Sequence, residues 1–301
     1  TSFPPDIGRL KAVESSVAST FYVYDSLGNV AASGHTVNGL TDTKIFSYEW
    51  YLNGGLKSEV YPSGRRVNYS VDGAGRTNKV YAGSVNYADM TAAVVGDNAF
   101  YADGRIAKMK LGNGRYEAHE YRTPGTPTVY KLGIAVGDGS LTRIEYDFHP
   151  ATNNGNVWKQ RIIRPQFSAE QEYGYDALNR ISGMYESAAV NRAYNYDRYG
   201  NRYVETSSNQ IPSPIAPEPT MPGHFNTANN RLAMTGTGFD AAGNQTTLAP
   251  YTLEYDAEGR NTVVKLSGAS YATFSYDGEG RRVRKAMNSG DTTYYVYDAL
   301  G

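Results

Sequence analysis

Short strand-like runs alternate with short polar turns along the C-terminal part of the chain. Residues 260–266, 271–276, 281–287 and 292–297 are rich in β-branched, aromatic and other strand-forming residues, and four residues dominated by Gly, Asp, Asn and Ser separate each run from the next. Such runs predict β-strands, and loops of about four residues join only antiparallel neighbours. The pattern therefore predicts a succession of β-hairpins.

The two faces of these predicted strands differ only moderately in polarity. Because successive side chains point to opposite faces of a strand, Phe274 shares a face with Tyr276, and Tyr295 shares a face with Tyr297. The opposite face carries more hydroxyl groups. The chain contains 27 Tyr against 9 Phe, and tyrosine combines apolar area with a hydroxyl that can face water. We therefore expect a sheet that is partly wet on both faces.

Every second turn repeats one phrase, in which an aromatic residue is followed by Asp, two variable residues, Gly, and then Asn or Arg. The period of this repeat is 21 residues between Tyr255, Tyr276 and Tyr297. In one copy Asn179 replaces the glycine, and the last copy ends at Gly301. A repeat of fixed period determines the architecture before any single residue is considered for chemistry.

The phrase predicts a tight turn. Asp can bond the backbone two residues further on, and the glycine position requires a positive φ, which Asn tolerates better than most residues. Valine at Gly259 or Gly280 should therefore destabilise the protein more than alanine at Gly268. We expect a turn-forming role for the following residues: Tyr24, Asp25, Gly28, Asp176, Asn179, Tyr196, Asp197, Gly200, Asp240, Gly243, Tyr255, Asp256, Gly259, Tyr276, Asp277, Gly280, Tyr297, Asp298 and Gly301.

Imperfect copies of the phrase extend the repeat over most of the chain. We expect residues 1–20 to form a lead-in segment and residues 21–301 to form the repeat ribbon. Residues 211–222 contain five of the 13 prolines between positions 212 and 222, so this segment must leave the sheet. It is interpreted as an exposed loop, with a strap or a docking element as the alternative.

Composition excludes several classes of function. The formal net charge is −1, and no basic run alternates with aromatic residues, so nucleic acid is not an expected partner. The chain has no cysteine, its four histidines are scattered, and no nucleophile elbow occurs. No run is long and apolar enough to span a bilayer. We therefore predict no catalytic, metal or cofactor site.

The repeated phrases resemble those of the Rhs and YD-repeat family, which includes Rhs polymorphic toxins, shell components of ABC toxins, and teneurins. The resemblance covers most of the chain, and the segments 225–232 and 294–301 are similar to the family's Asn-Asn-Arg-Leu segment and to the opening of its Rhs-associated core. It implies an all-β ribbon of antiparallel hairpins, curled into an open spiral or partial hollow shell. It also implies a secreted or cell-surface location.

The same resemblance implies a structural, non-enzymatic role. The chain would enclose or present a C-terminal toxin or other cargo domain, and its partners would be that cargo and further shell repeats. The chain lacks the Asp-Pro dipeptide of the family's self-cleaving segment, and we interpret it as a piece of a longer protein. Two alternatives remain: a glycan-binding module that uses its tyrosine-rich faces, and a β-propeller of about seven blades.

Overall fold

The computed structural model of the chain describes residues 7–91, 99–122, 125–187, 190–207 and 218–299. The chain divides into two compact units. We call residues 1–69 together with residues 235–301 the terminal unit, and residues 70–234 the central unit.

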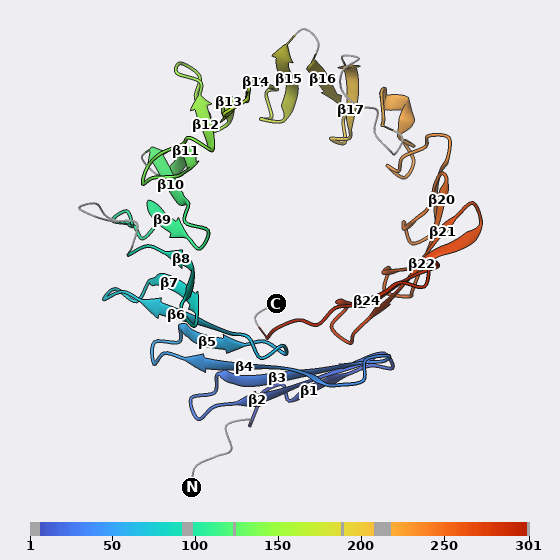
Figure 1. The fold of residues 1–301 in the computed structure, drawn as a ribbon. Coiled ribbons are helices and arrows are strands. Elements are labelled where there is room, and N and C mark those ends of the chain that lie inside the picture. The colour runs from blue at the N-terminus through green and yellow to red at the C-terminus, as the bar shows by residue number, and fades with distance from the viewer. Residues whose placement is uncertain (1–6, 92–98, 123–124, 188–189, 208–217, 300–301) are drawn as a thin grey trace. The chain divides into compact units, whose positions relative to one another are not determined.

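Within the terminal unit, each strand pairs in an antiparallel manner with the next strand along the chain, in two series (Figure 1). The second series forms a seven-stranded sheet. The strands are β1 (Ala12–Glu14), β2 (Ala18–Tyr24), β3 (Val30–Val37), β4 (Lys44–Trp50), β5 (Leu56–Val60), β6 (Arg66–Val71, which continues into the central unit), β18 (Thr237–Phe239), β19 (Gln245–Leu248), β20 (Tyr251–Tyr255), β21 (Asn261–Leu266), β22 (Ala269–Tyr276), β23 (Arg282–Met287) and β24 (Thr292–Tyr294).

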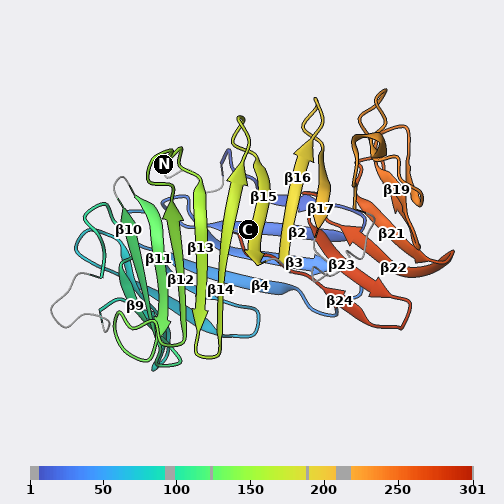
Figure 2. The same ribbon diagram turned by 90° about the horizontal axis from the view of Figure 1, so that it is seen from above.

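The central unit continues the same hairpin pattern. Its described strands from β7 to β17 each pair with the next strand along the chain, and Figure 2 shows β11 to β16 as neighbouring strands. They are β7 (Thr77–Ala82), β8 (Val85–Asp89), β9 (Lys108–Leu111), β10 (Tyr116–Arg122), β11 (Thr126–Gly133), β12 (Thr142–Phe148), β13 (Val157–Arg164), β14 (Phe167–Tyr175), β15 (Ile181–Ser187), β16 (Val190–Tyr196) and β17 (Arg202–Ser207), followed by the short 3₁₀ helix η1 (Pro222–His224).

These observations confirm the predicted all-β class and the antiparallel hairpin ribbon. The β-propeller alternative is wrong, because a propeller blade has four strands whereas the central unit pairs eleven strands, β7 to β17, in one unbroken series. Strand pairing also begins inside residues 1–20, where β1 pairs with β2. Among the described residues, no helix is long and apolar enough to cross a membrane.

Part of the proline-rich segment, residues 211–217, lies outside the described residues. The following residues contact the central unit's sheet. The amide N–H of Val204 on β17 donates to the carbonyl oxygen of Pro219 at 2.8 Å, and Arg192 on β16 forms an ion pair with Glu218 at 2.9 Å. The end of the segment is therefore attached to the last two strands of this sheet.

The strand register shifts at the same place in several hairpins, directly before the motif aromatic residue. In the hairpin of β22 and β23, Ser275 pairs with Arg284 but Tyr276 pairs with Arg282. The extra residue, Val283, forms a β-bulge, which increases local bending and twist. Val283 is also buried in the core of the terminal unit, so the bulge directs this side chain into the packed interior.

The core of the terminal unit joins its N-terminal and C-terminal parts. Ala18 on β2, Val37 on β3 and Val283 on β23 form one buried cluster, and Tyr294 and Val296 pack against it. Figure 1 shows the segment after β24 ending beside β4 and β5. Burial of these apolar side chains holds the C-terminal strands against the first hairpins.

Candidate functional site

The repeated turn is a closed hydrogen-bonded module, which the copy at Asp256 illustrates. The Asp256 amide donates to the carbonyl of Arg260 at 3.0 Å, and the Gly259 amide donates back to the Asp256 carbonyl at 3.0 Å. The Asp256 carboxylate accepts the amides of Glu258 and Arg260 through Oδ1 at 3.0 and 2.9 Å, and Nε of Arg260 through Oδ2 at 2.7 Å. One carboxylate therefore satisfies three donors of the turn.

The same module recurs in the copies that open with Asp25, Asp176, Asp197, Asp240 and Asp277. Where Asn stands in the place of Arg, its side-chain amide donates to the second carboxylate oxygen instead. Hydrogen bonds to a carboxylate favour its charged form. The side-chain amide of Asn29, with the backbone amides of the turn, therefore holds the pKa of Asp25 below its ordinary value.

The glycine position of the motif, three residues after the motif Asp, adopts the left-handed conformation. Five of the predicted glycines there have φ between 75° and 101°, and Asn179 has a φ of 60°. Gly268, which belongs to a different turn, also has a positive φ of 86°. Gly301 lies outside the described residues. Glycine adopts this conformation without the steric cost that other residues meet, so the conformation explains the residue found at each of these positions.

The motif tyrosines connect the turns to the preceding strands. Each hydroxyl donates to a backbone carbonyl near the beginning of an earlier strand, and these O–H···O distances lie between 2.6 and 2.8 Å for Tyr24, Tyr175, Tyr196, Tyr255, Tyr276 and Tyr297. Sequence reasoning assigned these hydroxyls only to water or to an unspecified neighbour. Their common 10- to 18-residue separation from the acceptor is the signal that could have revealed the bond.

The motif arginines link one repeat to the next. The guanidinium carbons of Arg180, Arg260 and Arg281 lie 4.0, 5.1 and 4.9 Å from the ring centroids of Tyr196, Tyr276 and Tyr297, respectively. Each of these arginines also donates to the motif Asp of its own turn. A cation over an aromatic face contributes about 0.5–1 kcal/mol at an exposed site. Asp, Arg and the next Tyr thus form a chain of contacts that runs from turn to turn.

The last motif copy lies against β3, β4 and β5 in the terminal unit. The amide of Ala299 donates to the hydroxyl of Tyr48 at 2.8 Å, and the same hydroxyl lies 3.3 Å from Oγ of Ser33. Ser33 and Tyr48 are both buried. The motif residue Asp298 therefore sits at a packed contact rather than at an open turn.

A buried carboxyl group lies at this contact. Glu59 on β5 is only 2% exposed, its Oε1 has no hydrogen-bond partner among the described residues, and the half-buried Asp298 is near enough to affect its pKa. Burial raises the pKa of Glu59 and Asp298 raises it further, although a hydrogen bond with Tyr61 acts in the opposite direction. Burial and the neighbouring Glu59 raise the pKa of Tyr61 to about 12.

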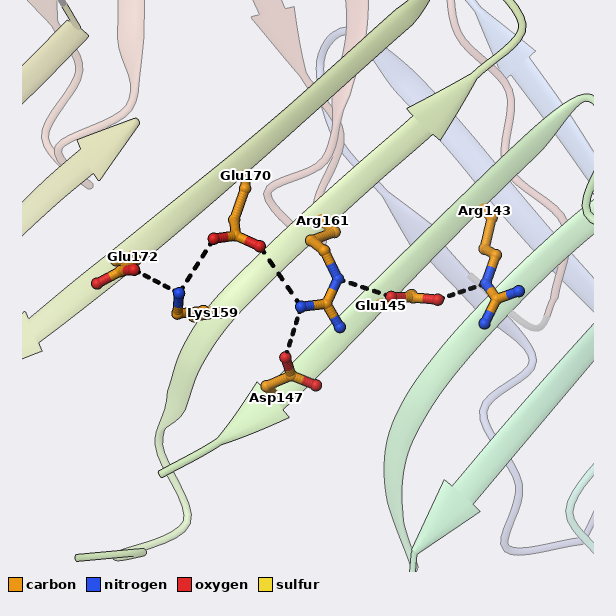
Figure 3. Close-up of polar contacts among 7 residues, drawn as sticks. All are labelled: Arg143, Glu145, Asp147, Lys159, Arg161, Glu170 and Glu172. Carbon is orange, nitrogen blue, oxygen red and sulfur yellow. Dashed lines mark hydrogen bonds and ion pairs between the residues drawn. The ribbon is translucent and has the colours of Figure 1, made fainter. Parts of the chain in front are cut away.

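The central unit carries a network of charged side chains across β12, β13 and β14 (Figure 3). Arg161 lies at its centre and contacts Glu145 at 2.7 Å, Asp147 at 2.8 Å and Glu170 at 3.5 Å. Lys159 extends the network, since it contacts Glu170 at 3.0 Å. Burial disfavours the charged form of Glu145, but the hydrogen bond from Arg161 and the nearby positive charges outweigh it and lower its pKa.

This network links β12, β13 and β14 through side chains that lie on the same face of the sheet. It comprises Arg143, Glu145, Asp147, Lys159, Arg161, Glu170 and Glu172, which are three cations and four anions. Cross-strand pairs of opposite charge stabilise a sheet by about 0.2–1 kcal/mol each. The network therefore strengthens the ribbon and presents a hydrophilic surface.

The histidines have structural partners. His35 is buried and its Nδ1 lies 3.1 Å from the hydroxyl of Thr20, and His119 contacts Glu117. His224 accepts the amide of Thr220 at 3.1 Å. In the part of the chain that the structure describes, no three side chains of His, Asp or Glu gather in a way that could hold a metal ion.

The comparison with known proteins gives similarity at the level of structure only. No family model matches the sequence, and no curated protein matches it. The Photorhabdus luminescens Tc holotoxin pore matches over 97% of this chain, with a TM-score of 0.74 and 17% sequence identity. A crystal structure of TcdB2-TccC3 also matches over 97% of this chain, with a TM-score of 0.71 and 17% identity.

This chain spans only about one sixth of those proteins, since the matched regions cover 16% and 17% of their chains. The similarity nevertheless extends over nearly the whole of this chain, including both units. It confirms, at the level of the fold, the resemblance to the Rhs and YD-repeat family that the turn motifs carry. The chain therefore has the hairpin-ribbon fold found within these Tc toxin structures.

Proposed function

We propose that the chain is a non-catalytic wall segment of an Rhs or YD-repeat shell, which encloses or presents a cargo domain that follows it in the polypeptide. The proposal rests mainly on the contacts that the motif side chains make. The carboxylate, the hydroxyl and the guanidinium of a repeat are all engaged in joining strands, turns and successive repeats. These groups hold an extended sheet together, and their hydrogen bonds occupy the atoms that would otherwise contact a substrate.

The similarity to Tc toxin structures supports the same proposal, because those chains are much longer and this chain matches one part of them. A wall segment requires stable, curved strands, whereas it does not require a binding or catalytic site. The bulges before the motif aromatics supply local bending at regular intervals. On this proposal the ribbon forms part of an open spiral or hollow shell in a secreted toxin-like protein, and its partners are further repeats and the cargo.

Limited proteolysis tests this proposal. The chain is expressed together with the native sequence that follows Gly301, and the cleavage rate of that sequence is compared with its rate when expressed alone. We expect cleavage at least tenfold slower in the joined protein. A variant that weakens the wall, Asp277→Ala, should restore part of the cleavage, because Asp277 is buried and organises the last complete turn. Equal cleavage rates in the joined and separate forms would contradict the proposal.

The glycan-binding alternative depends on tyrosines that are free to contact a sugar. Many motif tyrosines are instead bonded to backbone carbonyls and stacked under arginines. The tyrosine repeat by itself is therefore explained by the construction of the sheet, and we do not assign glycan recognition to the repeat as a whole.

A further inference from the structure

One turn of the central unit is longer than the sheet requires. Residues 149–156 connect β12 to β13, where complete copies of the phrase leave only five residues between their two strands. The turn has its own internal bonds: Nδ1 of His149 accepts the amides of Ala151 and Thr152 at 3.3 and 3.1 Å and lies 2.9 Å from the Thr152 hydroxyl. This extension is therefore an ordered structure in addition to the repeat.

The extended turn is fixed to the neighbouring motif turn. The side-chain amides of Asn154 and Asn156 both donate to Oδ1 of Asn179, at 2.6 and 3.3 Å. Asn179 occupies the left-handed position of its own turn, with a φ of 60°. Glycine at this position would provide no side-chain acceptor. Asn179, which replaces the motif glycine, is thus also the residue that anchors the extended turn.

A cavity of about 350 Å³ lies between the extension and the sheet. Thr152, Asn154 and Asn156 line one side, and aromatic rings of β13 and β14 line the other. Its volume falls in the lower part of the range for small-molecule sites, about 300–1,000 Å³. The cavity therefore suits a ligand of one or two rings that is apolar on one face and polar at its edge.

The aromatic side presents rings whose positions are fixed. The Tyr175 hydroxyl donates to the carbonyl of Val157 at 2.7 Å, and the Tyr173 hydroxyl lies 2.9 Å from the amide oxygen of Gln160. The ring of His149 meets that of Trp158 edge-on, with centroids 5.1 Å apart. The indole N–H of Trp158 makes no hydrogen bond to a described residue. Nζ of Lys159 lies 4.7 Å from the centroid of the Trp158 ring, so the wall offers mainly the rings of Tyr173 and Tyr175, together with the indole donor.

The charge of the cavity identifies the chemical class of its ligand. Its one acidic side chain, Asp176, already accepts two backbone amides and Nε of Arg180. The other polar groups of the lining are neutral amides, three hydroxyl groups, an indole N–H and an imidazole. Neutral amides bond hydroxyl groups as donors and as acceptors, while aromatic faces stack on apolar C–H faces. An anion or a cation would find no uncompensated opposite charge here.

We propose that this cavity binds a neutral hexopyranose residue of a glycan. The sugar ring would stack on the aromatic side, and its hydroxyl groups would bond Asn156 and the indole N–H of Trp158. The site depends on the extended turn and its anchor at Asn179, not on the repeated tyrosines. It is independent of the proposed wall function, since a shell segment requires no ligand.

Tryptophan fluorescence tests the site directly. The chain has only two tryptophans, so Trp50→Phe leaves Trp158 as the reporter. This protein is titrated with methyl β-glucopyranoside, methyl β-galactopyranoside and N-acetylglucosamine. We expect a saturable change with a millimolar Kd for at least one sugar, which is typical of a single ring bound on an open surface. Asn156→Ala should raise that Kd at least tenfold.

Two further variants separate the site from general effects. Tyr173→Leu removes one aromatic face and should also raise the Kd at least tenfold. Tyr271→Ala removes an exposed tyrosine on β22 in the other unit and should leave the Kd unchanged. The proposal is overturned if no sugar gives a saturable change up to about 100 mM, or if the Asn156 and Tyr271 variants bind equally well. Protease protection of a cargo would be unaffected by either result.

Discussion

Replacement of Gly280 tests whether the glycine position of the motif requires a positive φ. Gly280 has a φ of +80°, and an added Cβ would meet Nη1 of Arg260 at 3.7 Å, which is an ordinary van der Waals contact. The cost of a side chain there comes mainly from the backbone. We expect Gly280→Ala to lower the free energy of unfolding by about 1–2 kcal/mol, and Gly280→Val by about 2–3 kcal/mol. Gly280→Asn should cost less than about 1 kcal/mol, because Asn179 occupies the equivalent position with a φ of 60°.

Urea denaturation followed by circular dichroism measures these differences. Gly73→Ala is the matched control, because Gly73 lacks a positive φ and an added Cβ there would meet nothing within 4 Å; its effect should stay within about 0.5 kcal/mol. Gly268 is not a suitable control, since its φ is +86°. The reasoning is refuted if Gly280→Val unfolds within about 0.5 kcal/mol of the parent protein, or if asparagine is as costly as valine.

Three further changes probe the other contacts. Asp277→Ala should lower the unfolding free energy by about 3 kcal/mol in urea melts, because a buried carboxylate that bonds the amide and the guanidinium of Arg281 is lost; a loss below about 1 kcal/mol would contradict this. Tyr276→Phe should cost about 1 kcal/mol in the same assay through loss of the bond to the Asn261 carbonyl, and no measurable cost would count against that bond. Because the folded state raises the pKa of Glu59, the contribution of Glu59 to stability should be greatest below the ordinary Glu pKa, about 4.3, and fall as the pH rises from there through the raised value. Turn carboxylates such as Asp25, whose pKa is lowered, lose their contribution as the pH falls instead. Glu59→Gln should flatten the fall with rising pH in melts across that range, and an unchanged pH profile would exclude Glu59 as its source.

The repeated phrase allowed the turns and the strand order to be predicted because its physics is local. The bonds of Asp256 reach only two to four residues along the chain, and the φ of Gly259 is set within one turn. Loop length then determines that consecutive strands are antiparallel. No knowledge of distant contacts was needed for these features.

The features that sequence reasoning missed depend on contacts between distant residues. Glu59 and Asp298 are separated by most of the chain, and nothing in either local sequence indicates that they meet. The network around Arg161 depends on the register of three strands, which a bulge between Asp147 and Phe148 shifts. The anchoring role of Asn179 likewise became evident only when the extended turn was placed beside it.

The structure of the chain joined to its native continuation tests the wall function most directly. Electron cryo-microscopy of that longer protein would show where the polypeptide after Gly301 lies. The proposed function predicts that this polypeptide lies against the ribbon and is enclosed by it together with further repeats. A continuation that folds as a separate, exposed domain without contact to the ribbon would contradict the account.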